Sequence, residues 1–151
     1  MITAQVESLT ERLEEMKPLF PQHYEELALN KDKVPLSPQW HLYLARDAAG
    51  EVLLVTLREA GRLVGYFVGF IAPGLHYSTC LTLTMDIFYT HPDIRGGTAA
   101  LRLFRAVERE AKRRGVQRMF VGSKCHADAS RLFQALRYTE VERYFSVWLG
   151  E

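Results

Sequence analysis

The fold of this chain is decided by the stretch Tyr89-Thr-His-Pro-Asp-Ile-Arg-Gly-Gly-Thr-Ala-Ala-Leu-Arg-Leu103. A strand ends there, a Pro-Asp turn follows, and a helix with small residues in its first turn begins after Gly97. The first N–H groups of a helix have no partner inside the helix, and small residues let an anion approach them closely. The stretch therefore predicts a phosphate-binding turn, with an ordinary strand-to-helix turn as the alternative. It is neither a Walker loop nor a Gly-x-Gly-x-x-Gly dinucleotide pattern.

Before this stretch, the chain reads as a meander of three strands. Runs rich in Val and Leu at Val52–Arg58 and Arg62–Ile71 flank the turn Ala60-Gly61 and predict a hairpin. Leu81–Thr90 follows as a third strand, in which two sets of residues alternate: Leu81, Leu83, Met85 and Ile87 against Thr82, Thr84, Asp86 and Phe88.

After the stretch, strands and helices alternate. The helix that follows Gly97 carries an apolar face and ends near Gly115, and its face consists of Ala100, Leu103, Phe104, Val107 and Ala111. A short strand at 116–122, a helix at 127–136 and an aromatic last strand at Val141–Leu149 complete the order. A right-handed crossover through the long helix predicts that the third and fourth strands pair in parallel.

The first third of the chain predicts helices. Apolar residues at helical spacing indicate one over residues 4–17, and Pro21 can open a second, short one that extends through Leu29. Residues 30–38 read as a loop and 39–46 as one more helical piece. The predicted fold class is α/β (α+β), a single domain over residues 1–151 with a mixed central sheet flanked by helices.

Composition narrows the class of protein. Hydrophobic residues make up 48% of the 151 residues and charged residues 25%, which is typical of a globular domain and excludes a disordered chain. The formal net charge of +1 argues against nucleic-acid binding, although bases are concentrated between residues 95 and 118. Two distant cysteines, Cys80 and Cys125, exclude a disulfide framework and a cysteine zinc site, so we expect no metal. With no secretory signal and no membrane-spanning run, we expect a cytoplasmic protein that does not act on a membrane.

The order of elements and the segment His91-Pro-Asp-Ile-Arg-Gly-Gly-Thr-Ala-Ala-Leu101 resemble the GNAT superfamily of acyl-CoA-dependent N-acyltransferases. Arg95 and Ala100 match that family's signature, whereas Thr98 stands where Gly is usual. Two further segments agree, Gly61-Arg-Leu-Val-Gly-Tyr-Phe67 and Ala129-Ser-Arg-Leu-Phe-Gln-Ala-Leu-Arg-Tyr138. The resemblance covers residues 50–149 well and the N-terminal helices by position, and it is greatest to small members from bacteria and phages.

The resemblance implies a site for acetyl-CoA or coenzyme A. Residues 50–149 would form the cofactor-binding core and residues 1–46 the acceptor side. The backbone amides of Arg95, Gly96, Gly97, Thr98, Ala99 and Ala100 would hold the diphosphate. Phe88, Tyr89 and Thr90 would pair their backbone with the pantetheine arm. His126 stands where the family often has an Asn that contacts this arm, and a capping role in its loop is the alternative.

Transfer to an amine also needs proton chemistry. An amine has a pKa of about 10 and must be neutral to attack, so a general base helps. Asp86 is the candidate catalytic base, because it is the only acid in an otherwise apolar and Thr-rich strand; a solvent-facing residue is the alternative reading. The family's usual proton-donating Tyr is replaced by Phe133. Either another group serves as the acid (Cys125, His126, Ser130 or Tyr138), or the thiolate leaves unassisted.

Two functions of different classes follow. The first is an N-acetyltransferase that moves the acetyl group of acetyl-CoA to an amine of a small molecule or a protein, a reading favoured by Asp86 and the Arg-Gly-Gly turn. The alternative is a non-catalytic acyl-CoA-binding or protein-interaction module, favoured by Phe133 and Thr98. The aromatic last strand could in addition provide the contact of a homodimer.

Overall fold

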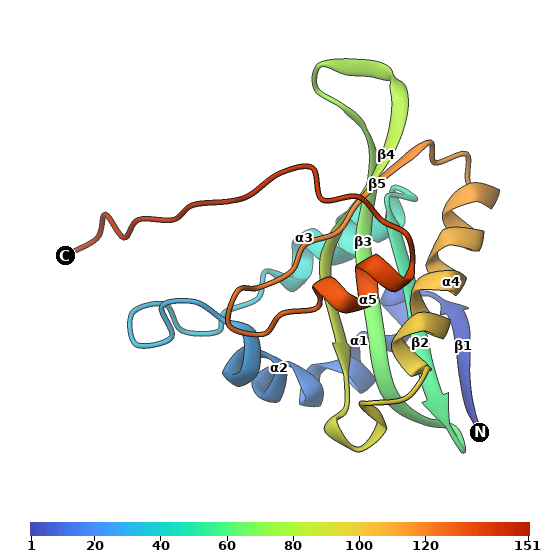
Figure 1. Cartoon of the computed structure of the whole chain (residues 1–151), viewed down its shortest axis with the longest axis horizontal. Coiled ribbons are helices and arrows are strands. Elements are labelled where there is room, and N and C mark those ends of the chain that lie inside the picture. Colours follow the sequence, from blue (N-terminus) through green and yellow to red (C-terminus); the bar gives the residue numbers. More distant parts are fainter.

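The computed structural model describes all 151 residues and places a five-stranded sheet at the centre of the molecule, in the order β1-β2-β3-β4-β5 (Figure 1). The strands are β1 (Ile2–Glu7), β2 (Val52–Glu59), β3 (Arg62–Gly74), β4 (Tyr77–Thr90) and β5 (Arg118–Phe120). The helices are α1 (Leu9–Met16), α2 (Phe20–Leu27), α3 (Trp40–Ala48), α4 (Ala99–Arg113) and α5 (Ser130–Ala135), with short 3-10 turns η1 (Lys17–Leu19) and η2 (Pro92–Ile94). The predicted mixed sheet with flanking helices is confirmed. No helix combines the length and the apolar character that crossing a bilayer requires.

The pairing of β2, β3 and β4 as an antiparallel meander and the parallel pairing of β4 with β5 were predicted, whereas the pairing of β1 with β2 was not. The first four strands pair antiparallel with their neighbours, and β4 pairs with β5 in parallel through α4. The parallel ladder is short, because only Thr82 to Thr84 face Arg118 to Phe120. Gly115, with φ +86°, lets the chain leave α4 toward β5 in the left-handed conformation that glycine tolerates.

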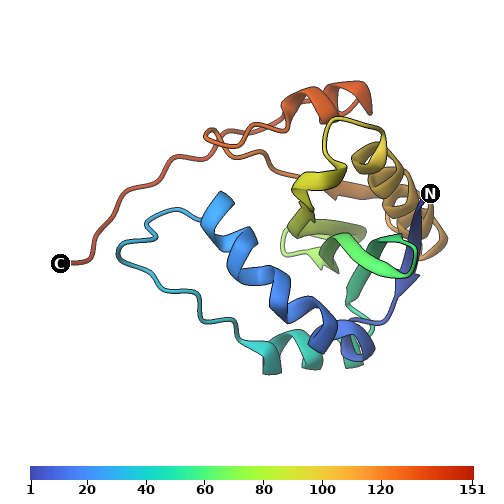
Figure 2. The same ribbon diagram turned by 90° about the horizontal axis from the view of Figure 1, so that it is seen from below.

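The helices cover both faces of the sheet. α1, α2 and α3 lie on one face, and α4 and α5 on the other, as the two ribbon views show together (Figures 1 and 2). Leu53, Phe67, Leu83, Leu103 and Phe104 are fully buried between the sheet and α4. A second group, which includes Leu9, Met16, Leu54, Tyr66 and Tyr89, is buried under α1 and its neighbours.

The prediction of a helix over residues 4–17 is wrong in its first part. Residues 2–7 form β1, which pairs antiparallel with β2, and the helix begins only at Leu9. Ser8 separates the two elements, since its Oγ accepts a hydrogen bond of 3.3 Å from the N–H of Glu11 and so caps α1. Ile2 and Ala4 pack against the core, so the apolar residues of this segment follow a strand period.

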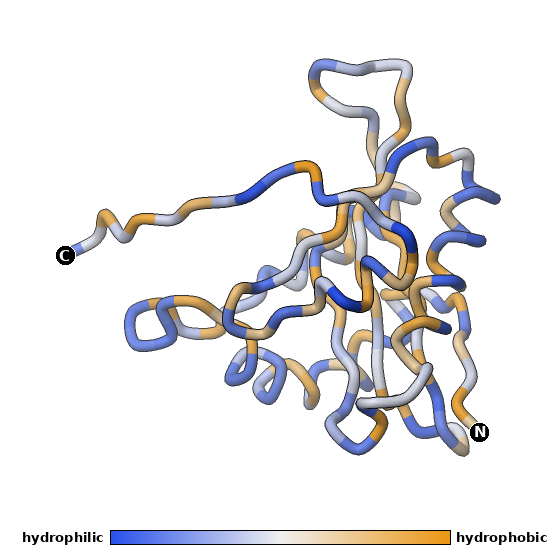
Figure 3. The backbone as a smooth tube through the Cα atoms, in the orientation of Figure 1, coloured by the Kyte–Doolittle hydropathy of each residue, from blue (hydrophilic) through white to orange (hydrophobic).

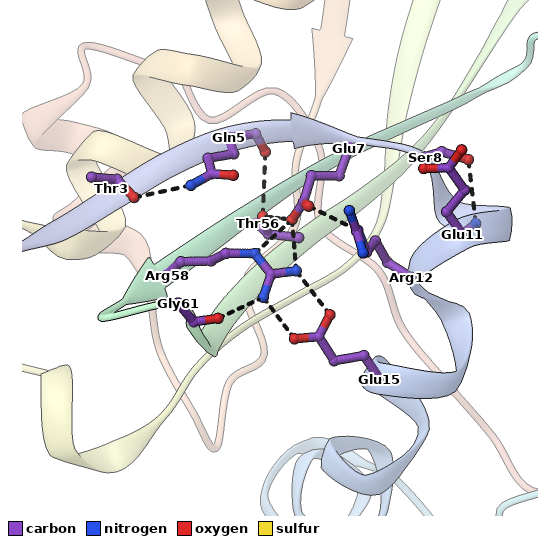
Figure 4. A network of polar contacts seen from close by, with 10 residues as sticks. All are labelled: Thr3, Gln5, Glu7, Ser8, Glu11, Arg12, Glu15, Thr56, Arg58 and Gly61. Atoms are coloured by element: carbon purple, nitrogen blue, oxygen red, sulfur yellow. Dashed lines mark hydrogen bonds and ion pairs between the residues drawn. The ribbon is translucent and has the colours of Figure 1, made fainter.

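A polar network joins β1, β2 and α1 (Figure 4). The guanidinium of Arg58 lies 2.9 Å from a carboxylate oxygen of Glu7 and donates to Glu15 at 2.6 Å. Thr56 donates a hydrogen bond to Glu7, and Arg12 pairs with the other oxygen of Glu7 at 2.9 Å. The Glu7 and Arg58 side chains are nearly buried, at 10% and 11% exposed, so the network fixes how α1 lies on the sheet.

The predicted last strand, Val141–Leu149, is wrong. Residues 139–151 form no helix or strand, and the chain runs away from the sheet as an exposed tail (Figures 1 and 2). A strand forms only where a neighbour supplies backbone partners, and this segment has none within its own chain. The strand predicted at 116–122 is confined to Arg118–Phe120, and the helix predicted at 127–136 to Ser130–Ala135.

Candidate active site

The turn between β4 and α4 presents a row of free backbone donors. The N–H groups of residues 96 to 101 donate to no protein acceptor, since the first helical bond of α4 runs from Arg102 N to Thr98 O. Gly96 has φ +88°, and a Cβ placed on Gly96 or Gly97 would meet open space. Gly96, Gly97 and Thr98 are exposed, while Ala99 is buried as the first residue of α4 and Ala100 is half-buried. This turn is open to an anion, and the positive end of the α4 dipole adds to the attraction.

Arg95 differs from the residues that follow it. Its amide donates to Pro92 O at 3.3 Å, so it is not one of the free donors. Its guanidinium donates to Thr90 O at 2.9 Å and to a carboxylate oxygen of Glu26 at 2.5 Å, and it lies over the ring of Tyr89. The side chain therefore connects the end of β4 to the last turn of α2.

Beyond Thr84, β4 loses its neighbour on the β5 side. The paired part of β5 stops at Phe120, while β4 continues to Thr90. Phe88, Tyr89 and Thr90 lie in this part of β4, which still pairs with β3 on its other side. Backbone groups on such an edge can pair with an extended ligand as they would with another strand.

A β-bulge places Asp86. Val68 faces Ile87 and Gly69 faces Met85, so Asp86 is an extra residue with no partner on β3. The extra residue reverses the alternation of the strand: Phe88 packs against the core under α4, together with Leu83 and Met85, whereas Ile87 packs on the α1 side. The strict alternation predicted for Leu81–Thr90 is therefore wrong beyond Met85, because a bulge shifts every later side chain to the opposite face.

Asp86 is held by α3. The Tyr43 hydroxyl donates a hydrogen bond of 2.5 Å to Oδ2 of Asp86. The protein that surrounds the carboxylate excludes water and raises the pKa of Asp86, although the Tyr43 bond and the nearby Arg46 act in the opposite direction. The same exclusion of water, with Asp86 close by, raises the pKa of Tyr43, so its hydroxyl remains a donor. A carboxylate with a raised pKa, held by one fixed donor, is suited to accept a proton near neutral pH.

Aromatic rings surround this position on the α1 side of the sheet. Trp40, Tyr43 and Phe70 form a chain of contacts, with ring centroids 5.9 and 5.7 Å apart, and Phe20 packs on Trp40 at 5.1 Å. The Arg46 guanidinium lies over Phe70 at 4.5 Å. The candidate base Asp86 thus lies beside the half-buried rings of Trp40, Tyr43 and Phe70.

His23 is a buried residue of α2 that packs beside the end of β4. It is 7% exposed, its Nδ1 lies 2.7 Å from the Tyr66 hydroxyl, and its ring stacks on Tyr89 at 5.2 Å. Burial lowers the pKa of His23 to about 4, so the ring is neutral at pH 7. The buried hydroxyl of Tyr89 has no hydrogen-bond partner. The sequence did not indicate a functional role for His23, because no other metal-ligating or catalytic residue lies at a characteristic spacing from it.

His126 contacts α2 and not β4. Its Nε2 lies 3.2 Å from the carbonyl oxygen of Leu27, at the end of the helix that also supplies Glu26 to Arg95. The last turn of α2 is therefore in contact with Arg95 after β4 and with His126 after β5.

Phe133 and two of the four residues considered as the acid are engaged elsewhere. Phe133 is buried in the core, and Tyr138 stacks on it while its hydroxyl donates to Glu108 at 2.7 Å. The Ser130 hydroxyl donates to Asp128 at 2.9 Å. Cys125 is an exposed free thiol.

Comparison with known families agrees with this geometry. The model of the acetyltransferase (GNAT) family matches residues 9–137. The chain therefore belongs to this family, and it is an N-acetyltransferase that uses acetyl-CoA. No curated protein shows significant similarity to the sequence.

Solved structures share the fold at low sequence identity. A ribosomal-protein-alanine N-acetyltransferase from Brucella melitensis biovar Abortus 2308 superposes with a TM-score of 0.76 at 16% identity, over 100% of this chain and 99% of that one. An aminoglycoside acetyltransferase from an uncultured soil metagenomic sample superposes with a TM-score of 0.76 at 16% identity, over 99% of both chains. The aminoglycoside acetyltransferase AAC(6')-Iy, solved in complex with a bisubstrate analogue that contains coenzyme A, superposes with a TM-score of 0.69 at 18% identity. The match covers 98% of this chain and 97% of that one.

Proposed function

We propose that this enzyme acetylates a primary amine on the α1 side of the sheet, with Asp86 as the general base. The observation that carries the proposal is the position of Asp86. It lies in the bulge of β4, within the part of the strand that has no neighbour on the β5 side, it accepts a hydrogen bond from Tyr43, and its pKa is raised. A base in this place can take the proton that the amine loses as it is acylated.

The residues at the end of β4 fit coenzyme A. The free N–H groups of residues 96 to 101, with open space at Gly96 and Gly97, suit a diphosphate. The edge of β4 at Phe88, Tyr89 and Thr90 suits the amide groups of the pantetheine arm. Arg95 would contribute through its guanidinium, because its amide is already used, and His126 through its ring, from the segment that follows β5.

Acetyl-CoA supplies the acetyl group as a thioester when it is bound. The protein orients the amine and receives its proton on a carboxylate oxygen of Asp86. The hydrogen bond from Tyr43 keeps that carboxylate in place. Because thiols have a pKa of about 8.5, the thiolate of coenzyme A would be a stable leaving group and would need no proton from position 133. The aromatic character of Phe133 is therefore compatible with catalysis.

The acceptor side consists of the N-terminal helices. Trp40 and Tyr43 of α3 line it together with Phe70 of β3, and Asp86 accepts a hydrogen bond from Tyr43. Such a surface suits a cationic amine with an apolar or ring-shaped body, and structural neighbours of this chain are named as acetyltransferases of aminoglycosides and of alanine in a ribosomal protein. We further propose a cytoplasmic location, since Cys80 and Cys125 are both free, as in a reducing compartment.

A two-stage experiment tests the proposal. Thermal denaturation with and without acetyl-CoA measures cofactor binding, and release of free thiol is then followed with a panel of aminoglycosides, polyamines and peptides with a free N-terminus. We expect a higher melting temperature with acetyl-CoA and thiol release with at least one amine. Cofactor binding without thiol release from any amine would instead identify a non-catalytic binding module.

A further inference from the structure

Arg46 on α3 is an exposed arginine without a protein partner, close to the candidate base. Its guanidinium lies over the Phe70 ring at 4.5 Å, takes part in no ion pair, and donates to no acceptor of the protein. Asp47, the next residue, is directed to α1, where its Oδ2 accepts hydrogen bonds of 2.9 and 2.6 Å from Thr10. A guanidinium carries five N–H donors in a planar fork that fits a carboxylate, so Arg46 can bind an anion from outside the protein.

The helix and the strand beneath it place Arg46 on the same wall as Asp86. Along α3, hydrophilic positions stand beside hydrophobic ones (Figure 3). Tyr43 and Arg46 are three residues apart and therefore share one face of the helix. Both contact the ring of Phe70, since the Tyr43 and Phe70 centroids are 5.7 Å apart. Because the Tyr43 hydroxyl also bonds to Asp86, the guanidinium and the candidate base lie at the two ends of the Tyr43–Phe70 contact.

The charges of this wall are one acid and one base. Burial raises the pKa of Asp86, and Arg46 is the charged side chain that opposes this rise. Glu26 on α2 does not supply a second free carboxylate, because it is paired with Arg95 at 2.5 Å. An acceptor with several ammonium groups would bring one of them against Arg46, where like charges repel. An acceptor with one amine and one carboxylate complements both groups.

We propose that the acceptor is an amino carboxylate, a small amine that also carries a carboxylate, and that Arg46 determines this specificity. The guanidinium binds the carboxylate through two parallel N–H···O bonds, while Asp86 faces the amine. The Phe70 ring holds the guanidinium, and a planar group that is already held loses less freedom when it binds. This inference rests on the proposed function, because it names the substrate class of the same site.

Matched pairs of acceptors test the carboxylate contact through thiol release. Each pair is an amino acid and its amide, namely β-alanine with β-alaninamide and phenylalanine with phenylalaninamide. In Arg46→Gln we expect the KM of each acid to rise about tenfold or more, the factor that a hydrogen bond between charged groups supplies, and the KM of each amide to stay the same. Arg46→Lys keeps the charge without the fork and should restore part of the loss. Using the same pair in every variant cancels the different basicity of the two amines.

The matched control is Arg62→Gln, which removes an exposed arginine at the start of β3 and should leave every KM unchanged. The loss of Arg46 also removes a charge that acts on Asp86. A change in kcat shared by both members of a pair comes from that effect, whereas a change in KM confined to the acid comes from the lost contact. O-phosphoethanolamine, an amine with a phosphate, distinguishes the two anions. If its KM alone depended on Arg46, the assignment of a carboxylate would be wrong.

Calorimetry separates a failure of this inference from a failure of the proposed function. The same pairs are titrated into the protein in the presence of saturating coenzyme A, which requires no turnover. We expect each acid to bind about tenfold tighter than its amide in the wild type, and equally in Arg46→Gln. Thiol release from no amine would refute the proposed function, and calorimetry would still decide the role of Arg46. Equal binding of acid and amide to the wild type, no binding of either, or a preference that survives in Arg46→Gln would each overturn the inference.

Discussion

Tyr43 on α3 and Asp86 in the β4 bulge, 43 residues apart in the sequence, are joined by a hydrogen bond of 2.5 Å. The bond holds the only carboxylate of this strand on the side of the sheet that α1, α2 and α3 cover. It also opposes the rise in the pKa of Asp86 that the surrounding protein causes. The pair therefore sets both the place and the basicity of the candidate base.

Replacing Tyr43 by Phe should move the acidic limb of the pH–rate profile to higher pH. The Tyr43 hydroxyl lowers the pKa of Asp86, so its loss lets the pKa rise further, and a larger fraction of Asp86 is protonated and inactive at a given pH. The measurement is kcat/KM for the amine between pH 5 and 9. A profile that keeps its position, or moves to lower pH, would contradict a role for Asp86 as the base.

Replacing Asp86 by Asn should abolish most of the turnover and leave the cofactor site intact. Loss of a general base typically costs roughly 100-fold or more in kcat. We expect the binding of acetyl-CoA, measured by calorimetry, to be unchanged, since the free amides of residues 96 to 101 remain. The matched control is Glu11→Gln, an exposed carboxylate on α1, which should keep full activity. If Asp86→Asn retained wild-type kcat, the carboxylate would be structural.

Replacing Gly97 by Val should weaken cofactor binding without destabilising the fold. A Cβ at Gly97 meets no atom within 4 Å and its φ is not positive, so the free protein tolerates a side chain there. The side chain would, however, stand in front of the free amides, and we expect the Kd for coenzyme A to rise about tenfold or more, which corresponds to ~1.4 kcal/mol. Gly97→Ala should have a smaller effect. Ser78→Val, at the exposed far end of β4, serves as the control. Equal affinity in Gly97→Val and wild type would place the diphosphate elsewhere.

The exposed turn with free amides and the order of β2, β3, β4 and β5 could be predicted from the sequence because both depend on local signals. Gly96, Gly97 and the small residues after them have few uses other than a tight turn with accessible amides. The crossover from β4 through α4 to β5 follows from chain length and handedness alone.

The position of Asp86 depends on a signal that the sequence does not carry. A bulge adds one residue to a strand without changing the strand's composition. The alternation of residues Met85 to Phe88 therefore did not indicate that Asp86 is bulged. The contacts of α2 with Arg95 and His126 join residues up to 99 apart, and only the folded chain brings them together. Residues 141–149 have the composition of a strand but form none. Composition is a local property, whereas a strand also needs a partner strand, which the local sequence does not specify.

The burial of His23 should make the stability of the protein depend on pH between about 7.5 and 5. Its folded pKa of about 4 lies below the unfolded value of 6.5, so as the pH falls the unfolded chain binds the proton first and unfolding becomes more favourable. The stability that His23 contributes is complete above pH 6.5 and is lost as the pH falls toward 4; by pH 5 the loss is about 2 kcal/mol. Urea denaturation at pH 7.5 and pH 5 measures it. In His23→Gln this loss should disappear, while His41→Gln, an exposed residue on α3, should behave as the wild type. A variant lacking His23 that still lost the same stability over this range would assign the effect to other groups.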